Sequence, residues 1–87
     1  MSKIPLTIQK LASSRDFQPS VRIGKSGITE RLIQEIDDQL SKKELVKIKI
    51  NRGLFQRDQV KQVWQHLSIE TNSNIVISRG NVCVLWR

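Results

Sequence analysis

The sequence predicts an α/β fold: one compact domain, residues 1–87, in which a mixed four-stranded sheet packs against helices. Segments with apolar residues at helical spacing alternate with short segments rich in Val and Ile, giving the order α-β-α-β-α-β-β. The chain has 87 residues, which is room for one domain. Its 38% hydrophobic and 26% charged residues are typical of a folded globular protein.

Three segments have the apolar spacing of amphipathic helices: residues 4–14, 29–41 and 59–71. Pro5 suits the first turn of the first helix, and Asp58 is expected to cap the third. The side chains expected to face the core recur every three or four positions: Ile4, Ile8, Leu11, Ala12, Ile28, Leu32, Ile33, Ile36, Leu40, Val60, Val63, Trp64 and Leu67.

Four short segments are expected to be strands: residues 21–23, 45–50, 75–77 and 82–86. In the second, apolar residues alternate with Lys47 and Lys49, the pattern of a sheet with one buried and one solvated face. Residues 78–81 (SRGN) are expected to form a hairpin turn. Helical crossovers favour parallel pairing and a hairpin requires antiparallel pairing, so the predicted sheet is mixed.

The net charge indicates the kind of partner. Fifteen Lys and Arg residues stand against eight Asp and Glu residues, giving +7 and a pI near 10.2. A small domain with this excess typically binds a polyanion, because neutralised phosphates release condensed counterions. No predicted helix combines a strongly apolar face with a Lys-lined one, so a membrane surface is not the expected partner. A basic surface that only aids solubility stays the alternative.

Several classes of protein are not expected. Cys83 is the only cysteine, which excludes an internal disulfide and fits a reducing, cytoplasmic location. No apolar run reaches the roughly 20 residues needed to span a bilayer, and the N-terminal residues do not resemble a secretory signal. One Cys and one His cannot build a zinc site alone, so no metal or cofactor is expected.

Gly24, Lys25, Ser26 and Gly27, here called the GxxG loop, lie between a predicted strand and a predicted helix. The glycines allow positive φ and close approach of another chain. Peptide N–H groups of the loop and of the helix start are expected to be unused internally and to favour a phosphate. The spacing is not that of an ATP-binding P-loop. A plain helix-entry turn would have the same spacing, so the motif alone leaves both interpretations open.

Three motifs resemble the CRM (YhbY-like) family. Residues 17–29 (FQPSVRIGKSGIT) are similar to the family's Pro-x-Val-x-Ile-Gly-Lys-x-Gly-Ile-Thr signature. Residues 44–49 (ELVKIK) resemble its second strand, and residues 79–87 (RGNVCVLWR) its closing segment, with Trp86 where Tyr is more usual. The resemblance implies a fold similar to the C-terminal domain of translation initiation factor 3. It also implies RNA binding with the GxxG loop as a contact.

Other basic residues could extend this contact. Arg22, Lys47 and Lys49 alternate with apolar strand residues and are expected to project from one sheet face. Arg31 lies one turn into the second helix, near the loop. Arg52, Arg57, Arg79 and Arg87 are expected in turns or at the end of the chain, where they could reach a phosphate. The predicted RNA-binding residues are Gly24, Lys25, Ser26, Gly27, Arg22, Arg31, Lys47, Lys49 and Arg79.

The sequence offers little support for catalysis. His66 has no evident partner, and the side chains of adjacent Asp37 and Asp38 diverge on a helix, so no acid–base pair is expected. Cys83 lies in a strand and is expected in the core. Trp64 and Trp86 are also expected in the core, on their periodicity, which leaves Phe55 as the one candidate for stacking on a base.

The leading hypothesis is therefore a monomeric, non-enzymatic RNA-binding protein. The resemblance implies ribosomal RNA, met during assembly of the large ribosomal subunit, as the partner. A DNA-coating chromatin protein is the main alternative, because charge alone does not distinguish the two nucleic acids. A protein-interaction adaptor whose charge is incidental is a third.

Overall fold

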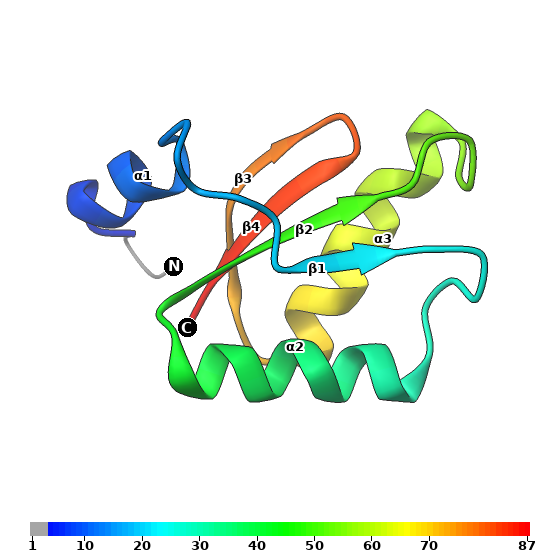
Figure 1. Cartoon of the computed structure of the whole chain (residues 1–87), viewed down its shortest axis with the longest axis horizontal. Helices are drawn as coiled ribbons and strands as arrows, with labels where there is room; N and C mark the ends of the chain where they lie inside the picture. Colours follow the sequence, from blue (N-terminus) through cyan, green and yellow to red (C-terminus); the bar gives the residue numbers. More distant parts are fainter. Residues whose placement is uncertain (1–3) are drawn as a thin grey trace.

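A computed structural model of the chain describes residues 4–87 (Figure 1). The elements follow the predicted order: α1 (Leu6–Ala12), β1 (Val21–Ile23), α2 (Glu30–Lys42), β2 (Leu45–Ile50), α3 (Arg57–Glu70), β3 (Asn74–Arg79) and β4 (Val82–Trp86). The predicted fold class is confirmed. The expectation of a single domain over residues 1–87 stays a prediction, and the first three residues lie outside the described part.

The sheet has the strand order β1-β2-β4-β3. β1 and β2 are parallel, because α2 returns the chain to the end of the sheet at which β1 begins. β4 is antiparallel to both of its neighbours, β2 and β3. The mixed four-stranded sheet is therefore as the sequence predicts, with β2 and β4 at its centre.

The two faces of the sheet are covered unequally. α2 and α3 pack on one face, where Ile36, Ile48 and Leu67 are wholly buried in the main core. α1 lies on the opposite face and covers only one end of it, where Ile8 and Val84 belong to a second, smaller cluster (Figure 1). The rest of that face, here called the open face, carries no helix. The basic strand residues project from it.

The first helix is shorter than the predicted 4–14. It spans Leu6–Ala12, and Pro5 is its N-cap with extended ψ, so Pro5 lies just outside the first turn. Of its expected apolar stripe, Ile8 and Ala12 are buried, but Leu11 is 55% exposed. A helix of seven residues that covers one end of a sheet buries only the side chains directly over that sheet.

The other two helices bury the predicted stripes. Leu32, Ile36 and Leu40 of α2 are buried, as are the four apolar residues expected of α3. The predicted Asp58 cap is wrong, because α3 begins two residues earlier than expected. Gln56 is the N-cap, and it exchanges hydrogen bonds with Gln59 in a capping box. Asp58 lies instead in the first turn, where its charge suits the helix dipole.

The hairpin turn is tighter than predicted. Ser78 and Arg79 pair with Cys83 and Val82 in the β3–β4 ladder, so they are strand residues and not turn residues. Only two residues connect the strands, and the first of them, Gly80, has φ of +52°. A two-residue connection between antiparallel strands commonly needs positive φ, which glycine adopts without strain.

Cys83 and Trp64 lie in the main core, as expected. Cys83 is wholly buried, and this burial raises the pKa of its thiol from 9.0 to about 12. The thiol is therefore protonated at neutral pH and behaves as a small apolar group. Trp86 is only half buried and packs on the smaller cluster beneath α1.

Arg87 does not have the role expected of it. Its guanidinium forms a salt bridge with the Asp37 carboxylate and donates to the Thr71 carbonyl oxygen at 2.9 Å. It also donates to the Ser41 hydroxyl at 2.9 Å. Arg87 thus ties the end of β4 to α2 and to the end of α3. A guanidinium with these partners is not available to a phosphate, and sequence could not show this because the partners lie 16 to 50 positions away.

Among residues 4–87, the structure holds no helix with both the length and the apolar character needed to cross a membrane.

Candidate nucleic-acid interface

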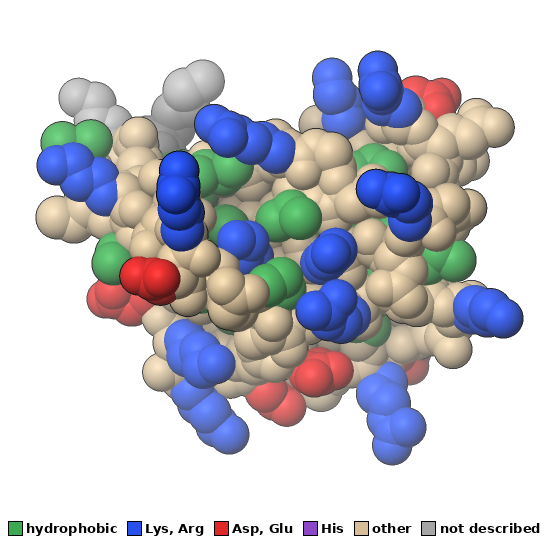
Figure 2. All heavy atoms as spheres, turned by 45° about the horizontal axis from the view of Figure 1, so that its top comes forward, with side chains coloured by type: hydrophobic (Ala, Val, Ile, Leu, Met, Phe, Trp, Pro, Cys, Tyr) green, Lys and Arg blue, Asp and Glu red, His purple; other side chains and the backbone are tan. Residues whose placement is uncertain are grey.

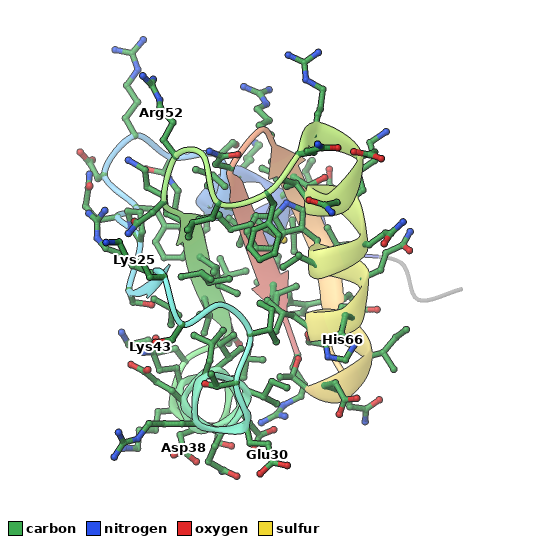
Figure 3. All side chains as sticks on the ribbon, turned by 90° about the vertical axis from the view of Figure 1, so that its right-hand side faces the viewer. Lys25, Glu30, Asp38, Lys43, Arg52 and His66 are labelled. Carbon is green, nitrogen blue, oxygen red and sulfur yellow. The ribbon has the colours of Figure 1, made fainter. Side chains whose placement is uncertain are left out.

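Three turns meet at one end of the sheet. Because β1 and β2 are parallel, their carboxyl ends lie side by side, and the Asn51 N–H donates to the Ile23 carbonyl oxygen at 2.9 Å. The hairpin turn joins them, since the Ile50 N–H donates to the Asn81 carbonyl oxygen at 2.8 Å. Figure 3 looks onto this end, and Lys25 and Arg52 lie on the same side of it. Loops at the carboxyl ends of strands are common positions for ligand sites in α/β sheets.

The GxxG loop is a closed turn. The Gly27 N–H donates to the Gly24 carbonyl oxygen at 2.9 Å, and Gly27 has φ of +68°, which favours glycine. A Cβ placed on Gly24 would lie 3.6 Å from the Asn51 side-chain nitrogen, an ordinary contact. Glycine is therefore required by backbone conformation at position 27 and not at position 24.

The expectation that the peptide N–H groups of the loop and helix start are unused is wrong in part. The Gly27 N–H closes the turn, and the Leu32 N–H donates to the Thr29 hydroxyl at 3.1 Å. Thr29 therefore caps α2, and Glu30 places a negative charge in its first turn. The Lys25 and Ser26 N–H groups have no partner among residues 4–87, so the loop offers a phosphate these donors as well as its side chains. Lys25 and Ser26 are exposed, and no described residue bonds to either side chain.

A row of cations crosses the open face. Arg22 pairs with Lys49 between β1 and β2, Lys49 pairs with Val82 between β2 and β4, and Val82 pairs with Arg79 between β4 and β3. Paired residues of neighbouring strands project from the same face. Arg22, Lys49 and Arg79, here called the cationic row, thus lie in register across four strands and are exposed. None of the three has an ion-pair partner within residues 4–87.

Lys47 also lies on this face but is engaged internally. Its ammonium donates to the Phe17 carbonyl oxygen at 2.8 Å and lies 5.8 Å from the centroid of the Phe17 ring. These contacts fasten the segment after α1 to β2. Arg31, the second residue of α2, is exposed and lies beyond the Ile28–Thr29 connection from the GxxG loop. Lys47 therefore has a structural role, whereas Arg31 stays a candidate contact.

A cleft of about 830 Å³ extends from the cationic row over the same end of the sheet. Arg22 and Lys49 form its border on the open face, and its far border lies on α3. We call it the end cleft. It is lined by Arg22, Lys49, Ile50, Asn51, Arg52, Phe55, Arg57, Val60, Lys61, Trp64, Ser78, Gly80 and Asn81.

The predicted RNA-binding residues did not include Arg52, Arg57 or Lys61, which all line this cleft. Arg52 and Arg57 had been expected only to be within reach of a phosphate. Arg57 and Lys61 are four positions apart on the exposed side of α3, a spacing that places them together on a helix. That spacing was a usable sequence signal for the pair. Sequence could not show that the start of α3 lies beside the hairpin turn, because this position depends on the tertiary fold.

The charge distribution favours one face. Figure 2 shows Lys and Arg side chains spread across the open-face side of the molecule, with the acidic side chains at its margins. In Figure 3, Glu30 and Asp38 lie at the far side of α2 from Arg52. The surface around the cationic row and the end cleft is thus positive and suits an extended anion.

The described residues bring together no cluster of three His, Cys, Asp or Glu side chains that could hold a metal ion. His66 is exposed on α3 and lies away from Lys25 (Figure 3). Asp37 binds Arg87, and the Asp38 carboxylate accepts from the Gln34 amide at 3.0 Å. That the chain is not an enzyme stays a prediction.

A small α/β domain with a GxxG turn and a cationic open face is the class of protein that the fold and this site define. The chain belongs to the CRS1 / YhbY (CRM) domain family, whose pattern matches residues 8–87. The predicted family is confirmed.

Relatives agree with this assignment. The chain is 28% identical over 76 residues to a probable RNA-binding protein of Methanocaldococcus jannaschii, covering 87% of this chain and 56% of that one. It is 27% identical over 71 residues to a probable RNA-binding protein of Pseudomonas aeruginosa, covering 82% and 66%. The chain thus spans less than two thirds of the length of either relative.

A solved structure has the same fold. The solution structure of a hypothetical protein from Staphylococcus aureus, described as a candidate RNA-binding protein, matches with a TM-score of 0.74 and 34% identity. The match covers 93% of this chain and 80% of that one.

Proposed function

We propose that this protein binds structured RNA without catalysing a reaction, and that the GxxG loop and the cationic row are the contacts. The observation that carries the proposal is the register of Arg22, Lys49 and Arg79 across all four strands, next to the GxxG loop. Two relatives named as probable RNA-binding proteins support the choice of RNA.

The physical basis is attraction between unpaired cations and phosphates. Neighbouring strands are about 4.8 Å apart, so the row presents charges over roughly 15 Å, a span that suits several phosphates of one backbone. Arg22 and Arg79 can hold a phosphate through two parallel N–H donors, and Lys49 acts as a point charge between them. Release of counterions from the RNA contributes to the binding free energy and makes it depend on salt.

The GxxG loop acts at the end of this row. Lys25 provides a mobile charge and Ser26 a hydroxyl donor, both exposed at the tip of a turn that Gly27 keeps closed. Phosphates that pass over the carboxyl end of β1 come within reach of both side chains. Backbone contacts of this kind recognise RNA by shape more than by base identity.

The family resemblance favours ribosomal RNA as the partner, met during large-subunit assembly in the cytoplasm, with the protein acting as a monomer. RNA sequencing after crosslinking in cells tests this choice. Enrichment of large-subunit ribosomal RNA around the crosslinks supports it, and a distribution that follows RNA abundance contradicts it.

The contact itself is tested with Lys25→Ala combined with Ser26→Ala. Each lost charge-assisted hydrogen bond costs about 1.5 kcal/mol, so affinity for a folded RNA should fall at least about tenfold. The slope of log affinity against log salt should fall by about 0.7 to 0.9, because one phosphate contact is lost. Lys42→Ala, an exposed lysine at the far end of α2, is the control for loss of charge and should change neither quantity.

Unchanged affinity and slope in the loop double variant would contradict the loop contact.

Competition with duplex DNA of equal length separates RNA from DNA as the partner. RNA should compete better, because A-form geometry and 2′-hydroxyl groups contribute only there. Equal competition would favour a DNA-coating protein.

A further inference from the structure

The end cleft has an apolar interior that the proposed backbone contacts do not use. Phe55, Val60 and Trp64 all line it. Phe55 is partly buried and packs on the main core, so its ring is held in place in spite of its position in an irregular segment. At about 830 Å³, the cleft is within the size range of sites that hold small organic ligands.

Trp64 adds an unused hydrogen-bond donor. Its side chain is 2% exposed, and its Nε1–H is the buried side-chain polar group without a partner in residues 4–87. A buried indole N–H normally has a partner, and leaving one unbonded costs about 1–3 kcal/mol. An acceptor atom brought to the indole from the cleft would satisfy this donor.

The border of the cleft is cationic. Arg52, Arg57 and Lys61 line it, and none of them has an ion-pair partner among the described residues. No Asp or Glu is among the described residues that line it. A ligand with both a phosphate and a flat, partly apolar ring would match the border and the interior together.

The cleft is also continuous with the proposed RNA surface. Arg22 and Lys49 belong to the cationic row and line the cleft as well. An RNA backbone that follows the row therefore reaches the cleft without leaving the protein. This continuity favours a nucleotide of the bound RNA over a free small molecule as the occupant.

We propose that the end cleft binds one unpaired nucleotide of the RNA. Its base stacks on the Phe55 ring, and an acceptor on the base edge takes the Trp64 indole N–H. Its flanking phosphates contact Arg52, Arg57 and Lys61. The proposal rests on the proposed function and adds to it a preference for RNA with an unpaired segment beside a helix.

The test compares Phe55→Leu with wild type on two RNAs: a hairpin with an unpaired loop, and a fully paired RNA of the same length. Leu keeps an apolar contact with the core but removes the flat ring. Hairpin affinity should fall about 5- to 100-fold, the usual effect of losing one base-stacking contact, and duplex affinity should be unchanged. Phe17→Leu, a partly buried Phe beside α1 on the open face and outside the cleft lining, is the matched control and should alter neither.

The Trp64 indole N–H gives a second measurement that needs no cleft substitution. The chain has two Trp residues, so Trp86→Phe assigns the two indole signals in a ¹H–¹⁵N spectrum. Addition of the hairpin should move the Trp64 signal downfield, as a new hydrogen bond does, and addition of the duplex should not. An unmoved signal at saturation, or equal shifts with both RNAs, overturns the proposal.

Failure of the cleft is distinguishable from failure of the proposed function. If Phe55→Leu binds both RNAs like wild type while the Lys25 and Ser26 double variant weakens both, the cleft proposal is wrong and the loop contact stands. If Phe55→Leu weakens only the binding of the hairpin while the loop double variant binds both RNAs normally, the cleft proposal stands and the loop contact is wrong.

Discussion

The two ends of the sheet use positive charge in opposite ways. At the end where β4 finishes, Arg87 is bound to Asp37, Ser41 and the Thr71 carbonyl. On the α1 side of the open face, Lys47 is bound to the Phe17 carbonyl. At the end where β1 and β2 finish, the cationic row and the cations of the end cleft have no such partners in the described chain.

The difference separates cations that hold the fold together from cations that are available to a ligand. Arg22 and Lys49 are directly paired on neighbouring strands, and like charges in that position repel. An arrangement that costs stability and has no internal compensation is expected where a ligand supplies the opposite charge. The net charge of +7 therefore includes both kinds of cation: those that hold the fold together and those that are available to a ligand.

The largest expected difference is in stability, at Arg87. Arg87→Leu should lower the free energy of unfolding by about 1–2 kcal/mol, because the Thr71 carbonyl and Asp37 lose their donor. The ion pair itself contributes little of this, since the side chains of Arg87 and Asp37 are 29% and 41% exposed. Denaturant unfolding measures the change.

Arg79→Leu is the matched control, because Arg79 is an exposed strand arginine without a partner. Its free energy of unfolding should stay within about 0.5 kcal/mol of wild type. Equal losses in the two variants would contradict the distinction between engaged and available arginines.

A smaller and sharper comparison uses two lysines of one strand. Lys47→Met should lower the free energy of unfolding by about 1 kcal/mol, because the bond to the Phe17 carbonyl is lost. It should leave the salt dependence of RNA binding unchanged, because the Lys47 ammonium is engaged internally. Lys49→Met should keep or slightly raise stability, because its repulsion with Arg22 is removed, and should lower the salt slope by about 0.7 to 0.9. The reverse pattern would show that the two lysines have been assigned the wrong roles.

Local sequence was sufficient for most of the fold. The period of two at Val46, Ile48 and Ile50 placed Lys47 and Lys49 on the solvated face, and the helical period placed Trp64 in the core. The position of the GxxG loop between a strand and a helix was also correct. Each of these predictions depends only on residues that are close together in the sequence.

What sequence missed depends on contacts between distant segments. The role of Arg87 depends on α2 and the end of α3 lying beside the end of β4. Lys47 differs from Lys49 because Phe17, 30 positions away, lies beside Lys47 on the open face. The end cleft exists because the hairpin turn and the start of α3 both lie beside the end of β2. The Gln56 cap was missed for a local reason: glutamine is a less common N-cap than the aspartate two positions later.

The central claim is that the cationic row, and not the net charge, binds RNA. Two variants test it with the same loss of three charges: Arg22, Lys49 and Arg79 to Gln, and the exposed Lys10, Lys42 and Lys43 to Gln. The measurement is the slope of log affinity for a folded RNA against log salt. The row variant should lose about 2 to 3 of slope and the second variant almost none. Equal losses in the two variants would contradict the claim and show that binding depends on overall charge.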